Sequence, residues 1–167
     1  MKTNRLIALL VIIFLGCSKP EPAQLTPQEQ EAVKKEIREI MNLQILACEK
    51  ADVDALLQAG LDYPGVIAFM TDGTMQDYQG AKNATTELFT SVASAKFTTV
   101  KDHFRFLSDT LVLYAWLGKC EMTLKTGEHS KMDSYGITYL FSKINNQWKV
   151  IHSHESASPP IQEKTKE

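Results

Sequence analysis

The chain has 167 residues, 44% hydrophobic and 23% charged, so it is long enough for one domain with a substantial core. Its 18 basic and 20 acidic residues give a net charge of −2, and the basic residues form no cluster. This balance argues against nucleic acid as a partner.

The first 16 residues have the zones of a secretory signal peptide: a basic start and an unbroken apolar run over 6–15. That run is too short to span a bilayer as a helix. The segment Phe14-Leu15-Gly16-Cys17 resembles the lipobox of bacterial lipoproteins, although Phe stands where Leu is usual. The resemblance implies cleavage after Gly16 and diacylglycerol on Cys17, which would anchor the chain to the membrane. An ordinary signal peptide and a membrane-spanning anchor stay open as alternatives.

Residues 17–25 are polar and rich in proline, so we expect the lipidated cysteine to be followed by a tether. Ser18 is not Asp, and the inner-membrane retention signal known from enteric bacteria is therefore missing. We expect a lipid-anchored protein of the cell envelope, in the outer membrane facing the periplasm or the surface if the source is Gram-negative. The tail over 159–167 is predicted to be flexible. A folded domain over 26–158 remains.

Helices are predicted in the first part of this domain. Thr26, Pro27 and Glu29 have the spacing of a capping box with proline at the first helical position. Asp52 is expected to cap a shorter helix, and Gly60 to end it. In chain order the patterns predict a helix over 27–49, a helix from 52 to 60, a strand over 66–70, a turn at 72–73 and a helix from 81.

Long strands are predicted in the second part, over 99–107, 111–124, 131–144 and 147–156. In the first of them, Val100, Phe104 and Phe106 are expected to share a face. Turn residues over 126–128 and 145–146 join the later strands, so successive strands must pair antiparallel. Helices that precede such a meander indicate an α+β fold.

The order of helix, helix, strand, helix and four long strands resembles the nuclear transport factor 2-like superfamily, with its SnoaL-like and kinase-association-like domains. The sharpest match is the last hairpin over 139–156, where Trp148, His152, His154 and Ser156 resemble the closing strand pair. The resemblance implies three helices packed in the concave face of a strongly curved, mainly antiparallel sheet, a cystatin-like cone with a pocket. Many members dimerise through the outer sheet face, and we expect a homodimer here. Because this fold hosts enzymes, binding modules and assembly domains, function must be argued from the site.

Strict alternation places Trp148, Val150, His152 and His154 on one face of the last strand. Since the first two residues are expected in the core, both histidines are expected to point into the cone. Three roles stay open for them: structural hydrogen bonding, lining a ligand pocket with one as a general base, or metal binding. The metal role lacks an Asp or Glu to complete the ligand set, so no metal is expected.

Three further residues are pocket candidates. Arg105 would bind a carboxylate if it points inward, and is otherwise a solvated strand residue. Tyr139 would offer a hydroxyl donor, and Trp116 a ring, unless both serve only the core or an interface. Cys48 and Cys120 form either a disulfide or two free thiols, and have no zinc-binding spacing.

No complete catalytic set is recognised, because the first helix lacks the inward Tyr of the isomerases and no Asp is assigned to the interior. We therefore expect an envelope protein that binds a small apolar or amphipathic ligand or a protein partner, without a cofactor. One alternative is a SnoaL-like cyclase, isomerase or dehydratase using His154 as general base, and another is an oligomeric assembly module. An inward Asp beside His152 or His154 would favour the enzyme, a dry apolar pocket the binder, and a filled cone the assembly module.

Overall fold

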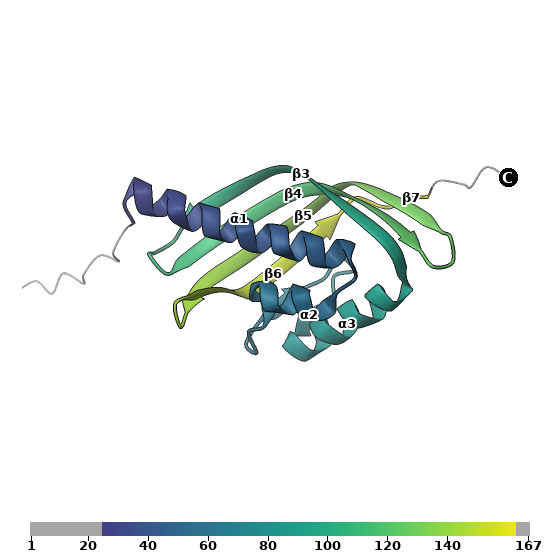
Figure 1. Cartoon of the computed structure of the whole chain (residues 1–167), viewed down its shortest axis with the longest axis horizontal. Coiled ribbons are helices and arrows are strands. Elements are labelled where there is room, and N and C mark those ends of the chain that lie inside the picture. The colour runs from purple at the N-terminus through teal and green to yellow at the C-terminus, as the bar shows by residue number, and fades with distance from the viewer. Residues whose placement is uncertain (1–24, 163–167) are drawn as a thin grey trace, which may run out of the picture.

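The computed structural model describes residues 25–162 (Figure 1). The predicted signal peptide, Cys17, the tether up to residue 24 and the end of the tail over 163–167 lie outside the described residues. Within 25–162, no helix combines the length and the apolar character needed to cross a membrane.

The first two helices begin where their capping residues predict, whereas the third begins at Tyr78, before the predicted start at residue 81, with Asp77 as its N-cap. The Thr26 amide donates to a Glu29 carboxylate oxygen at 2.8 Å, and the Ala55 amide donates to the Asp52 carboxylate at 2.9 Å. Gly60, with φ +85°, ends the second helical segment, and a Cβ there would lie 3.2 Å from the Trp148 carbonyl oxygen. The helical segments are α1 (Pro27–Glu49), α2 (Val53–Leu56), the kinked turn η1 (Leu57–Leu61) and α3 (Tyr78–Ser91).

The strands form one sheet in the order β2-β1-β6-β5-β4-β3. All neighbouring pairs on this path are antiparallel except β1 with β6, which run parallel. The strands are β1 (Ile67–Phe69), β2 (Met75–Asp77), β3 (Val92–Phe106), β4 (Leu111–Leu124), β5 (His129–Ile144), β6 (Gln147–Ala157) and β7 (Ile161–Gln162), which pairs with β5. The four predicted long strands are present, although β3 begins at Val92 and not at residue 99, and the short β2 and β7 are additional.

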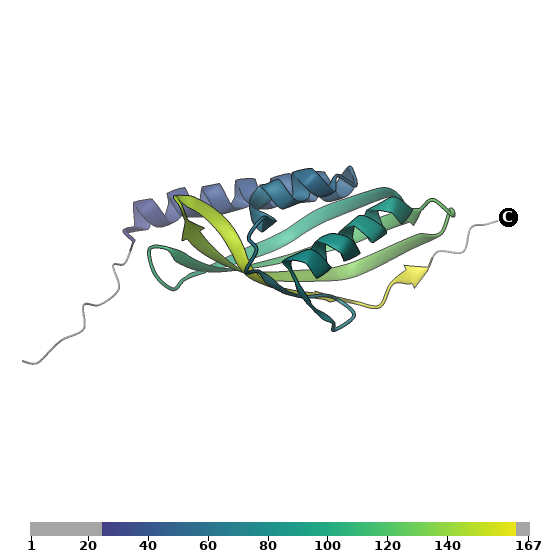
Figure 2. The ribbon, with the colours of Figure 1, turned by 90° about the horizontal axis from the view of Figure 1, so that it is seen from below.

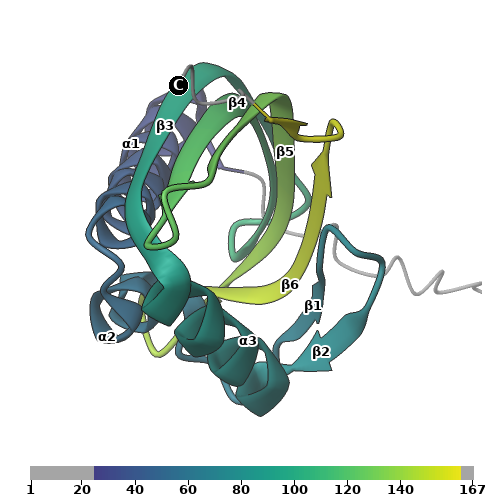
Figure 3. The same cartoon turned by 90° about the vertical axis from the view of Figure 1, so that its right-hand side faces the viewer.

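The sheet curls around the helices, as Figure 3 shows from β3 through β4 and β5 to β6. Its ladders are interrupted at Val100 in β3, at Lys119 in β4 opposite two residues of β5, and at Ile151 in β6. Such bulges bend a strand and increase its twist. The bulge also corrects one prediction: Val100 is 55% exposed and does not share the inner face of Phe104.

The core lies between α1 and the concave face of the sheet, and α1 runs along the length of the sheet (Figure 2). Ile37 and Met41 of α1 pack in one cluster with Val112, Phe141 and Val150 of the long strands. The α+β cone predicted from the order of elements is therefore confirmed.

Candidate ligand pocket

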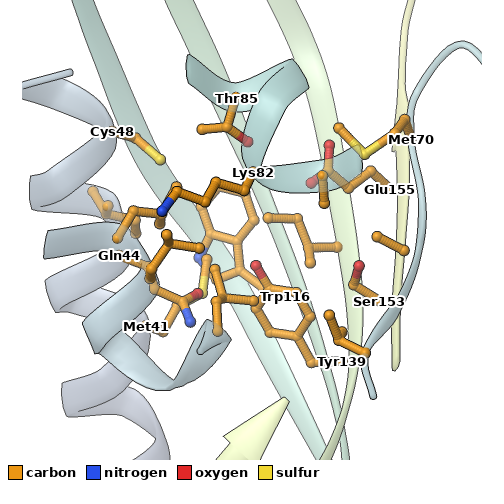
Figure 4. Close-up of a pocket in the computed structure, with 18 of the residues that line it drawn as sticks. Met41, Gln44, Cys48, Met70, Lys82, Thr85, Trp116, Tyr139, Ser153 and Glu155 are labelled. Carbon is orange, nitrogen blue, oxygen red and sulfur yellow. The ribbon is translucent and has the colours of Figure 1, made fainter. Parts of the chain in front are cut away.

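A cavity of about 120 Å³ opens between α1, the α2–η1 segment, α3 and the inner face of the sheet (Figure 4). Most of its lining is apolar, and includes Met41, Ile45, Leu57, Leu61, Ala68 and Met70. An apolar protein cavity of about 150 Å³ can hold benzene. The space inside this cone is therefore suited to a molecule about as large as a single ring.

Aromatic rings form one wall of the pocket. Trp116 lies 6.2 Å from Tyr135, and Phe97 lies 6.0 Å from the same Tyr135, measured between ring centroids. The Trp116 indole N–H donates to the Thr99 hydroxyl at 3.0 Å, which fixes its orientation. The indole also lies over Gly118, where a Cβ would overlap the ring.

Gln44 brings a polar group from α1 into this apolar lining. Its side chain is only 2% exposed, and its Nε2 donates to the Ala59 carbonyl oxygen at 2.7 Å. Because only the amide nitrogen can donate to that carbonyl, the orientation of the amide is fixed. Its Oε1 is left without a hydrogen-bond partner in the described part of the chain. Helical spacing from Ile37 and Met41 places Gln44 on the inner face of α1, but no pattern in the sequence indicates the unpaired oxygen.

Glu155 lies on β6 and lines the same cavity as Gln44. Its Oε2 accepts a hydrogen bond from the Tyr135 hydroxyl at 2.6 Å. Burial raises the pKa of the Glu155 carboxyl, and the Tyr135 hydrogen bond and the positive charge of His154 offset part of that rise. Glu155 therefore binds its proton more tightly than an exposed glutamate does.

The prediction that His152 and His154 point into the cone is wrong. The extra residue Ile151 interrupts the β5–β6 ladder, and beyond it Ser153 and Glu155, instead of the histidines, line the cavity. Both histidine rings pack against Phe69 of β1, with centroids 5.8 Å and 5.9 Å away. Neither is therefore placed to act on a molecule in the pocket.

The other predicted residues divide between the two sides of the sheet. Trp116 and Tyr139 line the cavity, and the Tyr139 hydroxyl has no hydrogen bond among the described residues. Arg105 is exposed on β3 and is not part of the lining, since its neighbours Phe104 and Phe106 face the core.

The lining of the pocket also includes one cysteine thiol. Cys48 and Cys120 are both free, and Cys48 lines the cavity. Burial raises the pKa of the Cys48 thiol to about 12, so it is a poor nucleophile. Among residues 25–162, no three His, Cys, Asp or Glu side chains are grouped so that they could hold a metal ion.

Comparison with known proteins agrees with this architecture. Residues 37–162 match the family model of the SnoaL-like domain. No curated protein matches the chain in sequence.

Solved structures share the fold at low sequence identity. A scytalone dehydratase-like protein from Novosphingobium aromaticivorans has 9% identity and a TM-score of 0.74, covering 84% of this chain and 94% of the other. The hexachlorocyclohexane dehydrochlorinase of Novosphingobium barchaimii has 11% identity and a TM-score of 0.70, covering 82% and 94%. A calcium/calmodulin-dependent protein kinase II association-domain-like protein from Xanthomonas campestris has 19% identity and a TM-score of 0.65, covering 83% and 96%. Proteins named as enzymes and as association domains thus both share this fold, the former with the higher TM-scores.

Proposed function

Because the chain belongs to the SnoaL-like family, we propose that its cone binds a small, mainly apolar ligand of about one ring. The observation that carries this proposal is the open cavity of about 120 Å³ with apolar walls and a buried, unpaired Gln44 oxygen. A domain used only for assembly would gain stability by filling that space with side chains. A retained cavity with a polar group at its wall is typical of a binding site.

The proposed setting is the bacterial cell envelope, with the pocket held near a membrane by diacylglycerol on Cys17. The apolar run over 6–15 and the lipobox-like segment support this setting. Replacement of Cys17 by Ser should move the protein from the membrane fraction to the soluble fraction of the native host. Retention of Cys17→Ser in the membrane after a salt wash would contradict lipid anchoring.

The proposed assembly is a homodimer formed through the outer face of the sheet. Leu113, Leu117 and Leu140 are only partly buried and lie on that face. Structural neighbours that are association domains also support self-association.

A proton-transfer reaction is the second candidate function. An enzyme of this fold would need a carboxyl group inside the cone next to one of the histidines. Glu155 follows His154 in the sequence and lines the cavity, and burial raises its pKa. The Tyr139 hydroxyl in the same pocket is a free hydrogen-bond donor. Mass spectrometry of a ligand incubated with the protein tests this candidate. Conversion by the wild type and recovery of unchanged ligand from Glu155→Gln would support it.

Methionine methyl groups give a direct test of ligand binding. Met41 and Met70 line the cavity, whereas Met75 is 63% exposed on β2 and lies outside it. The full chain carrying Cys17→Ser, labelled with ¹³C at its methionine methyl groups, would be titrated with toluene. We expect saturable shifts of the Met41 and Met70 signals, with the Met75 signal unchanged.

A pair of α3 variants provides the control. Ala81 lines the cavity and Ala84 does not, so Ala81→Phe should abolish the shifts while Ala84→Phe should leave them. Absence of saturable Met41 and Met70 shifts with toluene and with other one-ring probes would overturn the proposed function.

A further inference from the structure

Two acceptor groups face the pocket without donors to match them. Gln44 Oε1 has no hydrogen-bond partner, and Glu155 uses one carboxylate oxygen for Tyr135 and has none at the other. The Gln44 oxygen is also buried, and an unmatched buried acceptor costs free energy, so native proteins rarely keep one without a role. Both groups fit a ligand that donates hydrogen bonds, and neither fits a ligand that only accepts them.

The electrostatic field at this end of the pocket is negative. Burial raises the pKa of the Tyr139 hydroxyl and of the Cys48 thiol, and in both cases the negative charge of Glu155 raises it further. Glu49 also raises the pKa of Cys48, and its carboxylate accepts a hydrogen bond from the Phe97 amide at 3.0 Å. Tyr139 and Cys48 thus both experience the negative charge of Glu155, and Cys48 experiences that of Glu49 as well.

The aromatic wall adds a second feature that attracts cations. Trp116, Tyr135 and Tyr139 all line the pocket, and the faces of such rings attract an ammonium group. Trp116 is held in place by its bond to Thr99. A cation next to Glu155 would therefore meet both a carboxylate and ring faces in a partly dehydrated space.

Lys82 on α3 is the cationic side chain of this lining, and its position does not neutralise Glu155. Figure 4 shows the Lys82 nitrogen directed toward the α1 side, with Glu155 on the opposite wall. The cation that lowers the pKa of Glu155 is His154, on the neighbouring position of β6. None of the ion pairs in the described part of the chain includes Glu155, so a cation from outside the chain can pair with it.

We propose that the pocket selects a one-ring ligand bearing a protonated amine, with the ammonium group paired to Glu155 and the ring against Trp116. This inference rests on the proposed ligand-binding function and adds the chemical class of the ligand. An amine hydrogen or a second donor on the ligand supplies the missing partner of Gln44 Oε1.

The test compares three probes of similar size on the full chain carrying Cys17→Ser: protonated benzylamine, neutral benzyl alcohol and apolar toluene. Dissociation constants come from the Met41 and Met70 methyl shifts. We expect benzylamine to bind at least about tenfold more tightly than toluene, with benzyl alcohol between them. The isosteric variant Glu155→Gln should remove about tenfold of the benzylamine affinity and leave toluene binding unchanged.

Two further variants separate the contributions of Gln44 and Lys82 to the affinity for each probe. Gln44→Met should weaken benzylamine and benzyl alcohol but not toluene, and Lys82→Met should strengthen benzylamine alone by removing a like charge. If toluene binds as tightly as benzylamine, or if Glu155→Gln leaves benzylamine binding unchanged, the amine proposal is wrong while the binding function stands. If none of the three probes shifts Met41 or Met70, the binding function itself fails.

Discussion

At the scale of single residues, Glu155 links the pocket to the stability of the whole fold. Its pKa in the folded protein lies above the ordinary value of 4.5, because burial penalises the charged form. The folded state therefore binds this proton more tightly than the unfolded chain does. The resulting stabilisation is complete below the ordinary pKa and is lost as pH rises through the raised pKa.

Glu155→Gln removes this pH dependence and keeps an acceptor for the Tyr135 hydroxyl. The free energy of unfolding of the variant, relative to the wild type, should therefore rise as the pH increases from about 4 to about 8. Urea denaturation followed by circular dichroism measures it. Glu87→Gln on the exposed side of α3 is the control. A difference between wild type and Glu155→Gln that stays constant with pH would contradict a desolvated carboxyl.

Gln44 leads to a prediction about the balance of stability and binding. Gln44→Met removes one hydrogen bond, which is worth about 1 kcal/mol, and an unsatisfied buried oxygen, which costs about 1–3 kcal/mol. The Ala59 carbonyl oxygen loses its donor at the same time, so the two costs roughly cancel and the ligand-free variant should be within about 1 kcal/mol of the wild type in urea denaturation. Ile37→Ala in the same helix should lower the free energy of unfolding by about 2–5 kcal/mol, and it serves as the reference for a loss of core packing. A loss of similar size for Gln44→Met would mean that its Oε1 already has a partner in solution.

At the scale of elements, the sequence predicted what depends on local patterns. The helix starts at Pro27 and Val53 follow from capping residues, and the turn at Asn145-Asn146 follows from two residues that tolerate positive φ, here 49° and 65°. These features need no knowledge of distant parts of the chain. Tyr139 and Trp116 were pocket candidates with a role in the core or an interface left open, and the structure places both in the cavity lining.

The side of β6 that faces the pocket could not be predicted in this way. Whether Ile151 forms a bulge depends on how β5 pairs with it, and a shift of one residue exchanges the two faces of a strand. The alternation rule therefore selected His152 and His154 instead of Ser153 and Glu155. The only sequence sign of the change is the apolar Ile151 directly after Val150, which breaks the alternation.

Among the elements around the pocket, α3 has the weakest anchorage. None of its residues is buried, although Lys82 and Thr85 line the cavity. Its amides should exchange with deuterium roughly 100-fold faster than those of the central strand β4, because local opening needs little of the global unfolding free energy. A bound probe should slow exchange in α3 more than in β4. Hydrogen–deuterium exchange with mass spectrometry reads both elements, and equal rates in α3 and β4 would show that α3 opens only with the whole domain.

At the scale of the whole molecule, the cone has two faces with different chemistry. The helices lie on the concave side (Figure 3), so the described part of the chain leaves the outer face of the sheet open. There Leu140 is paired in register with Leu113 and His152, and its side chain is only partly buried. Leu113 and Leu140 form an apolar pair between Arg105 of β3 and His152 of β6, and such a pair in the centre of an open sheet face can pack against a second copy of the chain, since burial of apolar surface contributes about 25 cal/mol per Å².

The proposed homodimer therefore gives a prediction that is independent of the pocket. Leu140→Lys should convert the dimer to a folded monomer, because a lysine in the centre of the interface would lose its hydration on association. Leu43 on α1 is 56% exposed but lies away from the sheet, so Leu43→Lys should remain dimeric. Sedimentation velocity measures the mass of both variants, and toluene titration checks that each keeps its cavity. A monomeric wild type would contradict the homodimer. Dissociation by Leu43→Lys and not by Leu140→Lys would mean that the dimer interface lies on another surface.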